Sequence, residues 1–414
     1  MSKIWTHRKP CRLCSSRKVI PLLKFAFTPP GTSLIQPDGS ALVGEKIPLI
    51  VSLCEKCHLV QMQDVVDPGL LYQTYPHIGP PTPESESHYE AYAHEAAERA
   101  RLKSGDVVID IGSGNGLLLK AFLKLGMKAI GVDPAAAAQE ASKRLGALHY
   151  RDFFSPNLAN DIKNDHGMAA LITANYTLGA VDNLHAVSAG VRFLLKQEGV
   201  MFIEEPHLPD LLTQNEFDRI HHERLSFLTA STMDSFFRST LLHLLDAQRI
   251  PFRSGTLRLT VQRSDGPHVV APGLPAFLAQ EKAANLHLAE PYNAFALRVE
   301  TLKTKLNHLV SDFKGKGQKV AGYGASSRTT TLVHECGWNQ DTLDFIIDDD
   351  PAKHGCRLAG TDIPIVSAKA LSERKPGVVL LFAHHHANRL VKQLDPYRKA
   401  GGKCVTIFPA PIVV

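Results

Sequence analysis

Apolar and polar positions alternate over two parts of the chain in a way that separates strand-like from helix-like segments. Between about 105 and 205, short apolar runs suited to buried strands stand between longer stretches with helical periodicity. The strand-like runs are DVVIDIG at 106–112, KAIGVD at 128–133, AALITAN at 169–175 and VMFIEEP at 200–206. This alternation predicts an α/β fold with a parallel, doubly wound sheet.

A second, smaller α/β unit is predicted near the C-terminus, where the alternation resumes. Its strand-like runs are KVAGYG at 319–324, LDFIIDDD at 343–350, VVLLFAHH at 378–385 and, as a last strand, KCVTIFP at 403–409. A long helix over about 293–314 should connect the two units, because its apolar residues recur at steps of three or four and Gly315 and Gly317 follow it. Those apolar residues are Phe295, Val299, Leu302, Leu306, Leu309 and Phe313.

The N-terminal region has a different texture, with short strand-like runs such as 47–53 and four of the seven cysteines. A proline-rich link, GPPTP at 79–83, separates it from the central region. We therefore expect three domains, at 1–68, 69–290 and 291–414.

Composition excludes several classes of function. The net charge of +5 is spread over 414 residues without a basic block, which argues against nucleic-acid binding. No apolar run approaches the ~20 residues of a membrane span, and the first residues lack the apolar core of a secretion signal. A soluble, cytoplasmic protein with reduced thiols is expected.

The N-terminal cysteines form two CxxC pairs. Cys11 and Cys14 are separated by 39 residues from Cys54 and Cys57. Two such turns supply the four sulfur ligands of a tetrahedral zinc site, and with all four positions taken by protein the metal would be structural. A redox CxxC or uncoupled thiols are the alternatives, but redox chemistry needs only one pair.

The strand at 107–111 runs into a glycine-rich loop, Gly112-Ser113-Gly114-Asn115-Gly116, which opens a helix. Glycines here let backbone approach a ligand at a helix N-terminus. Leu117 stands where a dinucleotide fingerprint has its third glycine, so NAD is the weaker candidate. The form GxGxG is typical of class I methyltransferases, which bind S-adenosylmethionine (SAM).

Side chains at the ends of the neighbouring strands complete this expected cofactor site. Asp133 ends the second strand, where an acid accepts hydrogen bonds from ribose hydroxyls. Asp152 and Phe153 are candidates for pairing with and stacking on the adenine, and Asn175 ends the fourth strand. The expected cofactor-binding residues are Asp110, Gly112, Gly114, Asp133, Asp152, Phe153 and Asn175.

The order of these parts, with an EEP segment at 204–206, FDRIHHE at 217–223 and the C-terminal unit, resembles the three-domain sugar C-methyltransferases. The resemblance covers nearly the whole chain. It implies a zinc-binding domain, a class I methyltransferase domain and a C-terminal Rossmann-like domain that holds a nucleotide sugar. It also implies that a base removes a proton beside a keto group, and that the resulting enolate attacks the methyl group of SAM.

The chain departs from the family where this chemistry is expected. The family's Tyr-His-Glu-His run is His221-His222-Glu223-Arg224 here, so its presumed base falls on Arg224, which stays protonated near neutral pH. In the early Tyr-x-Tyr segment Tyr75 is retained and His77 replaces the second tyrosine. Ala180 falls on a family histidine, and Glu204 and His207 are expected to contact substrate.

Two interpretations of these departures stay open. In the first, His221 or His222 is the base, Glu223 orients it, and Arg224 steadies the enolate or a phosphate. In the second, the site serves another acceptor, or uses SAM in a non-methylating isomerase or cyclase reaction. A non-enzymatic scaffold descended from the family is a third, weaker hypothesis.

In the C-terminal unit, the resemblance implies substrate-binding roles for residues at strand ends, the edge where α/β sheets bind ligands. These residues are Ser326, Arg328, Asp348 and His384, the last standing where the family has a tryptophan. The run His384-His385-His386 is not expected to bind a metal, because three consecutive residues cannot all face one ion. The partner is a small molecule, and the chain is expected to be a monomer or weak dimer.

Overall fold

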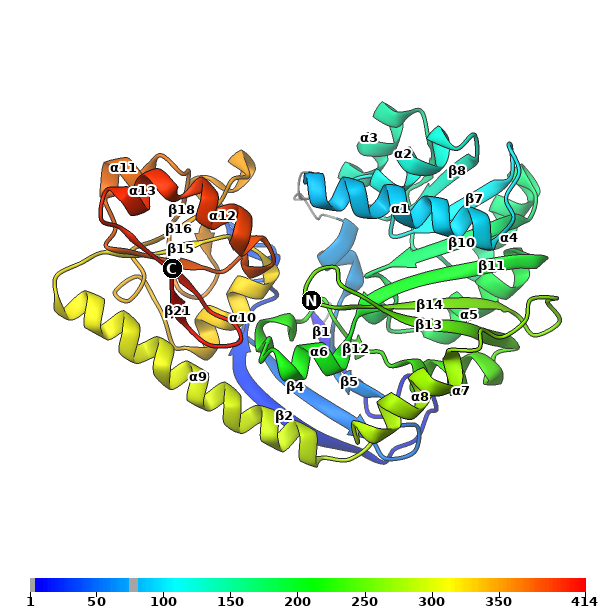
Figure 1. The fold of residues 1–414 in the computed structure, drawn as a ribbon, viewed down its shortest axis with the longest axis horizontal. Helices are drawn as coiled ribbons and strands as arrows, with labels where there is room; N and C mark the ends of the chain where they lie inside the picture. Colours follow the sequence, from blue (N-terminus) through cyan, green and yellow to red (C-terminus); the bar gives the residue numbers. More distant parts are fainter. Residues whose placement is uncertain (1–3, 74–80) are drawn as a thin grey trace.

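The computed structural model of the chain describes residues 4–73 and 81–414, and it confirms the expected α/β architecture with a cysteine-bearing N-terminal domain. Figure 1 shows the central and C-terminal sheets on two sides of the molecule, with the strands of the N-terminal domain passing beneath both. Within the part of the chain that the structure describes, no helix combines the length and apolarity needed to cross a bilayer.

The central domain is built on a seven-stranded sheet with the order β13-β14-β11-β10-β7-β8-β9. Its strands are β7 (Val107–Ile111), β8 (Lys128–Val132), β9 (Leu148–Tyr150), β10 (Ala169–Asn175), β11 (Leu195–Pro206), β13 (Leu242–Ile250) and β14 (Thr256–Arg263). The sheet is parallel from β9 to β11, as predicted, but β14 and β13 run antiparallel at one edge. The loop at 251–255 is too short for the crossover that parallel strands require, so these two strands form a hairpin.

Side chains alternate between the two faces of this sheet. Val107, Ile109 and Ile111 join one core and Val108 the other, as the two-residue period of a strand requires. On the first face pack α4 (Pro156–His166), α5 (Leu184–Leu194) and α7 (Ala230–Ser239), and on the second α1 (Pro83–Arg99) and α2 (Leu117–Lys124). The remaining helices of this domain are α3 (Ala136–Leu145), η2 (Leu178–Ala180), α6 (Leu208–Thr213), η3 (Phe217–Arg219) and α8 (Leu274–Ala283).

The N-terminal domain holds a four-stranded antiparallel sheet with the order β12-β5-β4-β2. Three strands come from the beginning of the chain: β2 (Val19–Thr28), β4 (Ile47–Cys54) and β5 (Val60–Met62). The fourth, β12 (Ser226–Phe227), comes from the middle of the chain, far outside the expected range 1–68. A separate pair, β1 (Trp5–His7) with β6 (Asp64–Val66), leads into a short π-helix, η1 (Gly69–Gln73).

The C-terminal domain has a six-stranded sheet with the order β18-β16-β15-β19-β20-β21. Its strands are β15 (Val320–Tyr323), β16 (Phe345–Ile347), β18 (Ile365–Val366), β19 (Val378–Leu381), β20 (Lys403–Thr406) and β21 (Ile412–Val413), and only β21, which comes after the expected last strand, is antiparallel. Its helices are α10 (Ser327–Glu335), η4 (Pro351–Lys353), α11 (Ala370–Arg374), η5 (His384–His386), α12 (Ala387–Gln393) and α13 (Asp395–Lys399).

Two features join the outer domains. The long helix α9 (Glu290–Gly315) lies along β2 and buries the predicted residues Phe295, Val299, Leu302 and Leu306 in a core shared by the N-terminal and C-terminal sheets (Figure 1). In addition, β3 (Leu34–Ile35) pairs antiparallel with β17 (Arg357–Leu358). The N-terminal domain is therefore packed against both of the others.

Candidate functional site

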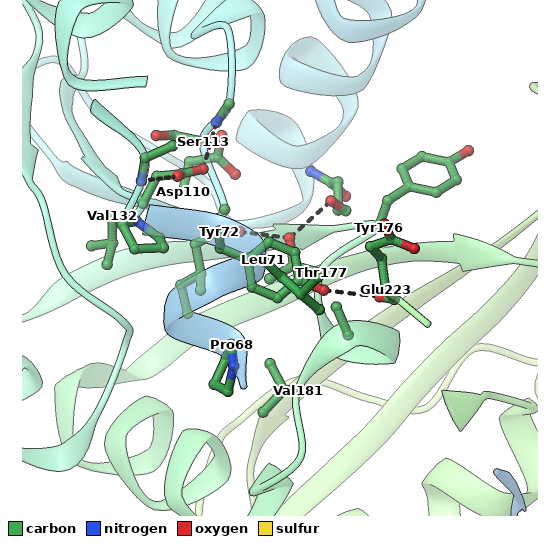
Figure 2. A pocket seen from close by; sticks show the side chains of 18 of the residues that line it. Pro68, Leu71, Tyr72, Asp110, Ser113, Val132, Tyr176, Thr177, Val181 and Glu223 are labelled. Carbon is green, nitrogen blue, oxygen red and sulfur yellow. Dashed lines mark hydrogen bonds between the residues drawn. The ribbon is translucent and has the colours of Figure 1, made fainter. Parts of the chain in front are cut away.

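A cavity of about 940 Å³ lies where the three domains meet. The carboxyl ends of β7, β8 and β10 form one wall, and η1 of the N-terminal domain forms another. The C-terminal domain contributes Ser326, Ser327, His385 and His386. In Figure 2, Leu71 and Tyr72 of η1 are drawn between Asp110 on one side and Tyr176 and Glu223 on the other. The volume suits a cofactor together with part of a substrate.

The glycine-rich loop at the end of β7 requires glycine for steric reasons. Gly112 has a φ of +77°, and a Cβ there would lie 2.1 Å from Oγ1 of Thr177. Gly114 also has a positive φ, of +50°, but a Cβ there would meet only the carbonyl oxygen of Gly112 at 3.9 Å. The loop therefore lies against Thr177 on one side and is open at Gly114, where a ligand could approach its backbone.

Two carboxylates flank this loop. The buried Asp110 accepts a hydrogen bond from Oγ1 of Thr173 at 2.7 Å, and burial raises the pKa of Asp110 to about 7. Asp133 accepts hydrogen bonds from the backbone N–H of Gly114 at 3.0 Å and of Ala135 at 2.9 Å. Burial also raises the pKa of Asp133, although both hydrogen bonds oppose the shift.

The other expected cofactor residues line the same cavity. Asp152 and Phe153 are among its lining residues, and so is Asn175, which ends β10 two residues after Thr173, the residue paired with Asp110. The hydroxyl of Ser113 is buried at the cavity and has no hydrogen-bond partner among the described residues. A loop open to a ligand, an unsatisfied hydroxyl and carboxylates at two strand ends fit a nucleoside cofactor such as SAM.

Of the four expected catalytic residues at 221–224, His222 and Glu223 line the cavity. Nδ1 of His221 lies 2.9 Å from Oε2 of Glu223, and the backbone N–H of Thr32 donates to the other carboxylate oxygen at 2.8 Å. Burial alone would raise the pKa of Glu223, but these hydrogen bonds hold it at about 2. The carboxylate therefore stays ionised across the neutral range.

The side chains of His222 and Arg224, the other two residues of this run, are engaged by protein oxygen atoms. The imidazole of His222 is almost fully buried, with Nε2 3.3 Å from the carbonyl of Pro48 and Nδ1 3.5 Å from Oγ1 of Thr28. Burial lowers the pKa of His222. Arg224 donates to Oε2 of Glu205 at 2.7 Å and is not among the residues that line the cavity.

Glu204 and His207 were expected to contact substrate, but neither lines the cavity. The fully buried Glu204 accepts two hydrogen bonds from Arg258, at 2.9 and 2.6 Å, and lies 2.8 Å from Nε2 of His88. His207 pairs with Asp210 at 2.7 Å. The partners of Glu204 are 54 and 116 residues away in the chain and carry no local signal, whereas Asp210 is only three residues from His207.

The expected residues of the C-terminal domain divide in the same way. Ser326 caps α10 and lines the cavity, whereas Asp348 accepts hydrogen bonds from the backbone of Ala325 and from Lys353. Arg328 and His384 belong to a buried ion-pair cluster with Glu216 and Asp218. Tyr75 and His77, the remaining two expected site residues, lie outside the described residues.

Several cavity residues were not predicted from the sequence. Tyr176 follows Asn175 with a φ of +55°, and Arg253 lies in the β13–β14 hairpin with its guanidinium 4.6 Å from the Tyr176 ring. Tyr72 of η1 donates to the carbonyl of Glu223 at 3.0 Å. His385 lies 3.0 Å from Oγ of Ser254, where the sequence indicated no role for it. A tyrosine directly after a strand end was the one signal in the sequence that could have identified any of these.

The four N-terminal cysteines come together in one cluster. Their sulfur atoms all lie within 4.8 Å of one another, with two pairs 3.5 Å apart, near the ~3.8 Å that a tetrahedral zinc–thiolate site requires. The two CxxC turns have matching geometry, because Ser15 N–H donates to the carbonyl of Cys11 and His58 N–H to that of Cys54. Four sulfurs in this arrangement fit zinc and leave no position for a substrate.

Comparisons with known proteins match each domain separately. A zinc binding domain family matches residues 11–72, a methyltransferase domain family matches 86–240, and a C-methyltransferase C-terminal domain family matches 251–409. A curated relative, the C-methyltransferase NovU of Streptomyces niveus, is 28% identical over 404 residues, covering 98% of this chain and 96% of that protein.

Solved structures match less than half of the chain. A SAM-dependent methyltransferase from Anabaena variabilis is 17% identical over 46% of this chain and 99% of its own, with a TM-score of 0.32. The 1,6-didemethyltoxoflavin-N1-methyltransferase from Burkholderia thailandensis is also 17% identical, over 44% of this chain and 80% of its own, with a TM-score of 0.32.

Proposed function

The chain is a three-domain, SAM-dependent C-methyltransferase with a zinc-binding N-terminal domain, and on this premise we propose that it methylates a carbon beside a keto group of a nucleotide-activated sugar. One observation carries the proposal. A single cavity extends from the cofactor loop at Gly112–Gly116 to the N-terminus of α10 and to Arg253. A helix N-terminus and an arginine both favour an anionic group such as a diphosphate. An acceptor with a phosphate end and a neutral reactive end suits such a cavity.

The methyl acceptor needs a base at the reacting carbon. His221 and its hydrogen-bonded partner Glu223 form the candidate pair: Glu223 lines the cavity and holds Nδ1 of His221, and the other ring nitrogen of His221 is the group that takes up the proton. His222 is the weaker candidate, since both ring nitrogens face protein oxygens. Arg224 is already engaged by Glu205.

The remaining chemistry depends on the cavity wall. Removal of the proton beside the keto group leaves an enolate, whose carbon attacks the electrophilic methyl group that SAM supplies when bound. Tyr89 of α1 is a hydroxyl donor on this wall, whereas the hydroxyl of Tyr176 is already hydrogen-bonded to Oγ1 of Thr256. Burial raises the pKa of Tyr89, so its phenol remains protonated and able to donate to the enolate oxygen.

A second candidate is C-methylation of a different acceptor. The observation that favours it is the cavity wall at Ala180, where the family has a histidine and this chain has a methyl group. Together with the engaged Arg224, this leaves more space and fewer polar groups than the family pattern has. Such a site suits a bulkier or less polar acceptor.

Incubation with methyl-labelled SAM and a panel of nucleoside-diphosphate 4-keto sugars tests the proposal. Transfer of label to a carbon of one of these sugars is the expected result. If the protein binds SAM but labels none of the panel, the sugar assignment is wrong and the second candidate takes its place. The base assignment is tested by Glu223→Gln and His221→Asn, with His222→Asn as the matched comparison. The first two should lower kcat by about 100-fold, the general-base contribution, and the third much less.

A further inference from the structure

We propose that Arg12 is a positioning residue that couples the zinc site to the methyl-transfer site. Arg12 lies between Cys11 and Cys14, inside the first CxxC turn, and its side chain is fully buried. The corresponding residue of the second turn, Glu55, is exposed. A buried arginine held between two metal ligands has its backbone fixed by the metal, so its guanidinium group is aimed from a rigid base.

The guanidinium group of Arg12 reaches segments of two domains. One nitrogen, Nη1, donates to the carbonyl of Leu225, two residues after Glu223, and lies 3.5 Å from Oγ of Ser226. The other terminal nitrogen donates to the carbonyl of Met62 on β5 at 2.6 Å. Nε lies 3.4 Å from Oδ1 of Asp182. One side chain thus ties the zinc domain to the segment just after the candidate base.

These contacts matter because Leu225 and Asp182 both line the cavity. The backbone N–H of Leu225 donates to the carbonyl of Gly179 at 2.7 Å, and the N–H of Met62 donates to the carbonyl of Leu225 at 2.9 Å. Leu225 is therefore the point at which β5, η2 and the 221–224 run are hydrogen-bonded together. Arg12 adds a charged hydrogen-bond donor to the carbonyl of Leu225.

A second contact runs from the same turn to the central domain. The carbonyl of Leu13 lies 2.7 Å from Nε2 of His185, on α5. Arg8 reinforces the link by donating to the other oxygen of Asp182 at 2.8 Å. Loss of zinc would release the turn that carries Arg12 and Leu13, and with it both contacts. We therefore expect the metal to act on the reaction through geometry, from outside the cavity.

The proposal is tested with the full chain and the variant Arg12→Met, which keeps side-chain volume and removes the donors. Arg17→Met is the matched control, because Arg17 is an exposed arginine three residues beyond Cys14. Hydrogen exchange should become at least tenfold faster at the amides of Met62 and Leu225 in Arg12→Met, with one zinc per chain retained. Arg17→Met should match the unmodified chain. Unchanged exchange at these two amides overturns the proposal.

Kinetics provide the second measurement. This measurement rests on the proposed methyl transfer. In Arg12→Met, kcat should fall by about 100-fold, because a small misplacement of a catalytic segment lowers the rate by about that factor. The KM for SAM should change by less than about threefold. Removing zinc with a chelator should lower kcat of the unmodified chain by a similar factor but add little in Arg12→Met, because both changes act on the same contacts. If the reductions of kcat caused by Arg12→Met and by zinc removal multiply, Arg12 and zinc act independently and the coupling is refuted.

Two further measurements keep the outcomes distinct. If Arg12→Met does not fold, Arg12→Lys takes its place, because lysine retains the charge with a single donor nitrogen. Amide exchange at Met62 and Leu225 should then be faster than in the unmodified chain, by a smaller factor than for Arg12→Met. Exchange rates in Arg12→Lys equal to those of the unmodified chain would refute the proposal. If no acceptor is found, hydrogen exchange at the amides of Met62 and Leu225 still decides the coupling. Failure of the sugar assignment is thereby separated from failure of the Arg12 proposal.

Discussion

Replacing Arg258 by methionine should destabilise the central domain severely while leaving the cavity in place. Arg258 donates to Glu204 at 2.9 and 2.6 Å and also to Glu95, and its guanidinium lies 4.8 Å from the Tyr92 ring. Among the described residues, the methionine would leave the fully buried Glu204 with His88 alone as a side-chain partner. Breaking a buried ion pair by removing one partner costs about 3 to 5 kcal/mol.

The assay is urea unfolding monitored by circular dichroism, with two comparison variants. Arg249→Met removes an arginine on the neighbouring strand β13 whose side chain is 51% exposed and pairs with Asp210, so it should cost at most about 1 kcal/mol. The double variant Glu204→Gln with Arg258→Met removes both partners and should recover most of the loss.

Glu204 is thus expected to be a structural residue, and two results would contradict this role. One is a free energy of unfolding of Arg258→Met within about 1 kcal/mol of that of the unmodified chain, because loss of an exposed ion pair costs no more than that. The other is a Glu204→Gln variant of unchanged stability with a raised KM for the acceptor, which would restore the substrate-binding role predicted from the family pattern.

Two further predictions concern the cofactor end of the cavity. Gly112→Ala should weaken S-adenosylhomocysteine binding in calorimetry by at least about tenfold, because its Cβ would overlap Thr177. Gly146→Ala is the control: Gly146 also has a positive φ (+70°) but lies in open space, so this variant should keep the affinity. Equal losses of affinity in the two variants would refute the steric argument. Burial raises the pKa of Asp110 from 3.8 to about 7. Between these two pH values the folded chain therefore binds more protons than the unfolded chain. The stability that Asp110 contributes is greatest below about pH 4 and falls as the pH rises towards 7. The stability of the unmodified chain relative to Asp110→Asn, measured by urea unfolding without cofactor, should therefore decline between about pH 5 and about pH 8, and a constant difference would show that Asp110 titrates normally.

The parts of the fold that the sequence predicted correctly are those encoded by neighbouring residues. The CxxC turns, the β7 loop with its glycines and the face of α9 each depend on side chains within one element, so spacing alone identified them. The hairpin β13–β14 was missed because its loop at 251–255 carries one glycine, and nothing in it dictates the direction of the next strand.

The candidate site was harder to predict because its geometry depends on contacts between distant segments. Arg12 stood between two cysteines and gave no sign of its partners at Asp182 and Leu225, 170 and 213 residues away. Glu204 likewise reads as an active-site acid until Arg258 and His88 are brought beside it. A local motif fixes which chemistry is available, but only the assembled core decides which charged groups face the cavity.

The strand β12 has a consequence for the order in which the protein can fold during synthesis. The N-terminal sheet pairs β5 with Ser226–Phe227, and β3 pairs with Arg357–Leu358. A ribosome must therefore release well over half of the chain before the first domain can complete its own sheet, and most of it before β3 finds its partner. Pairings of such large sequence separation fold slowly and expose unpaired strand edges meanwhile. The nascent N-terminal domain would be a natural client of molecular chaperones until the central domain emerges.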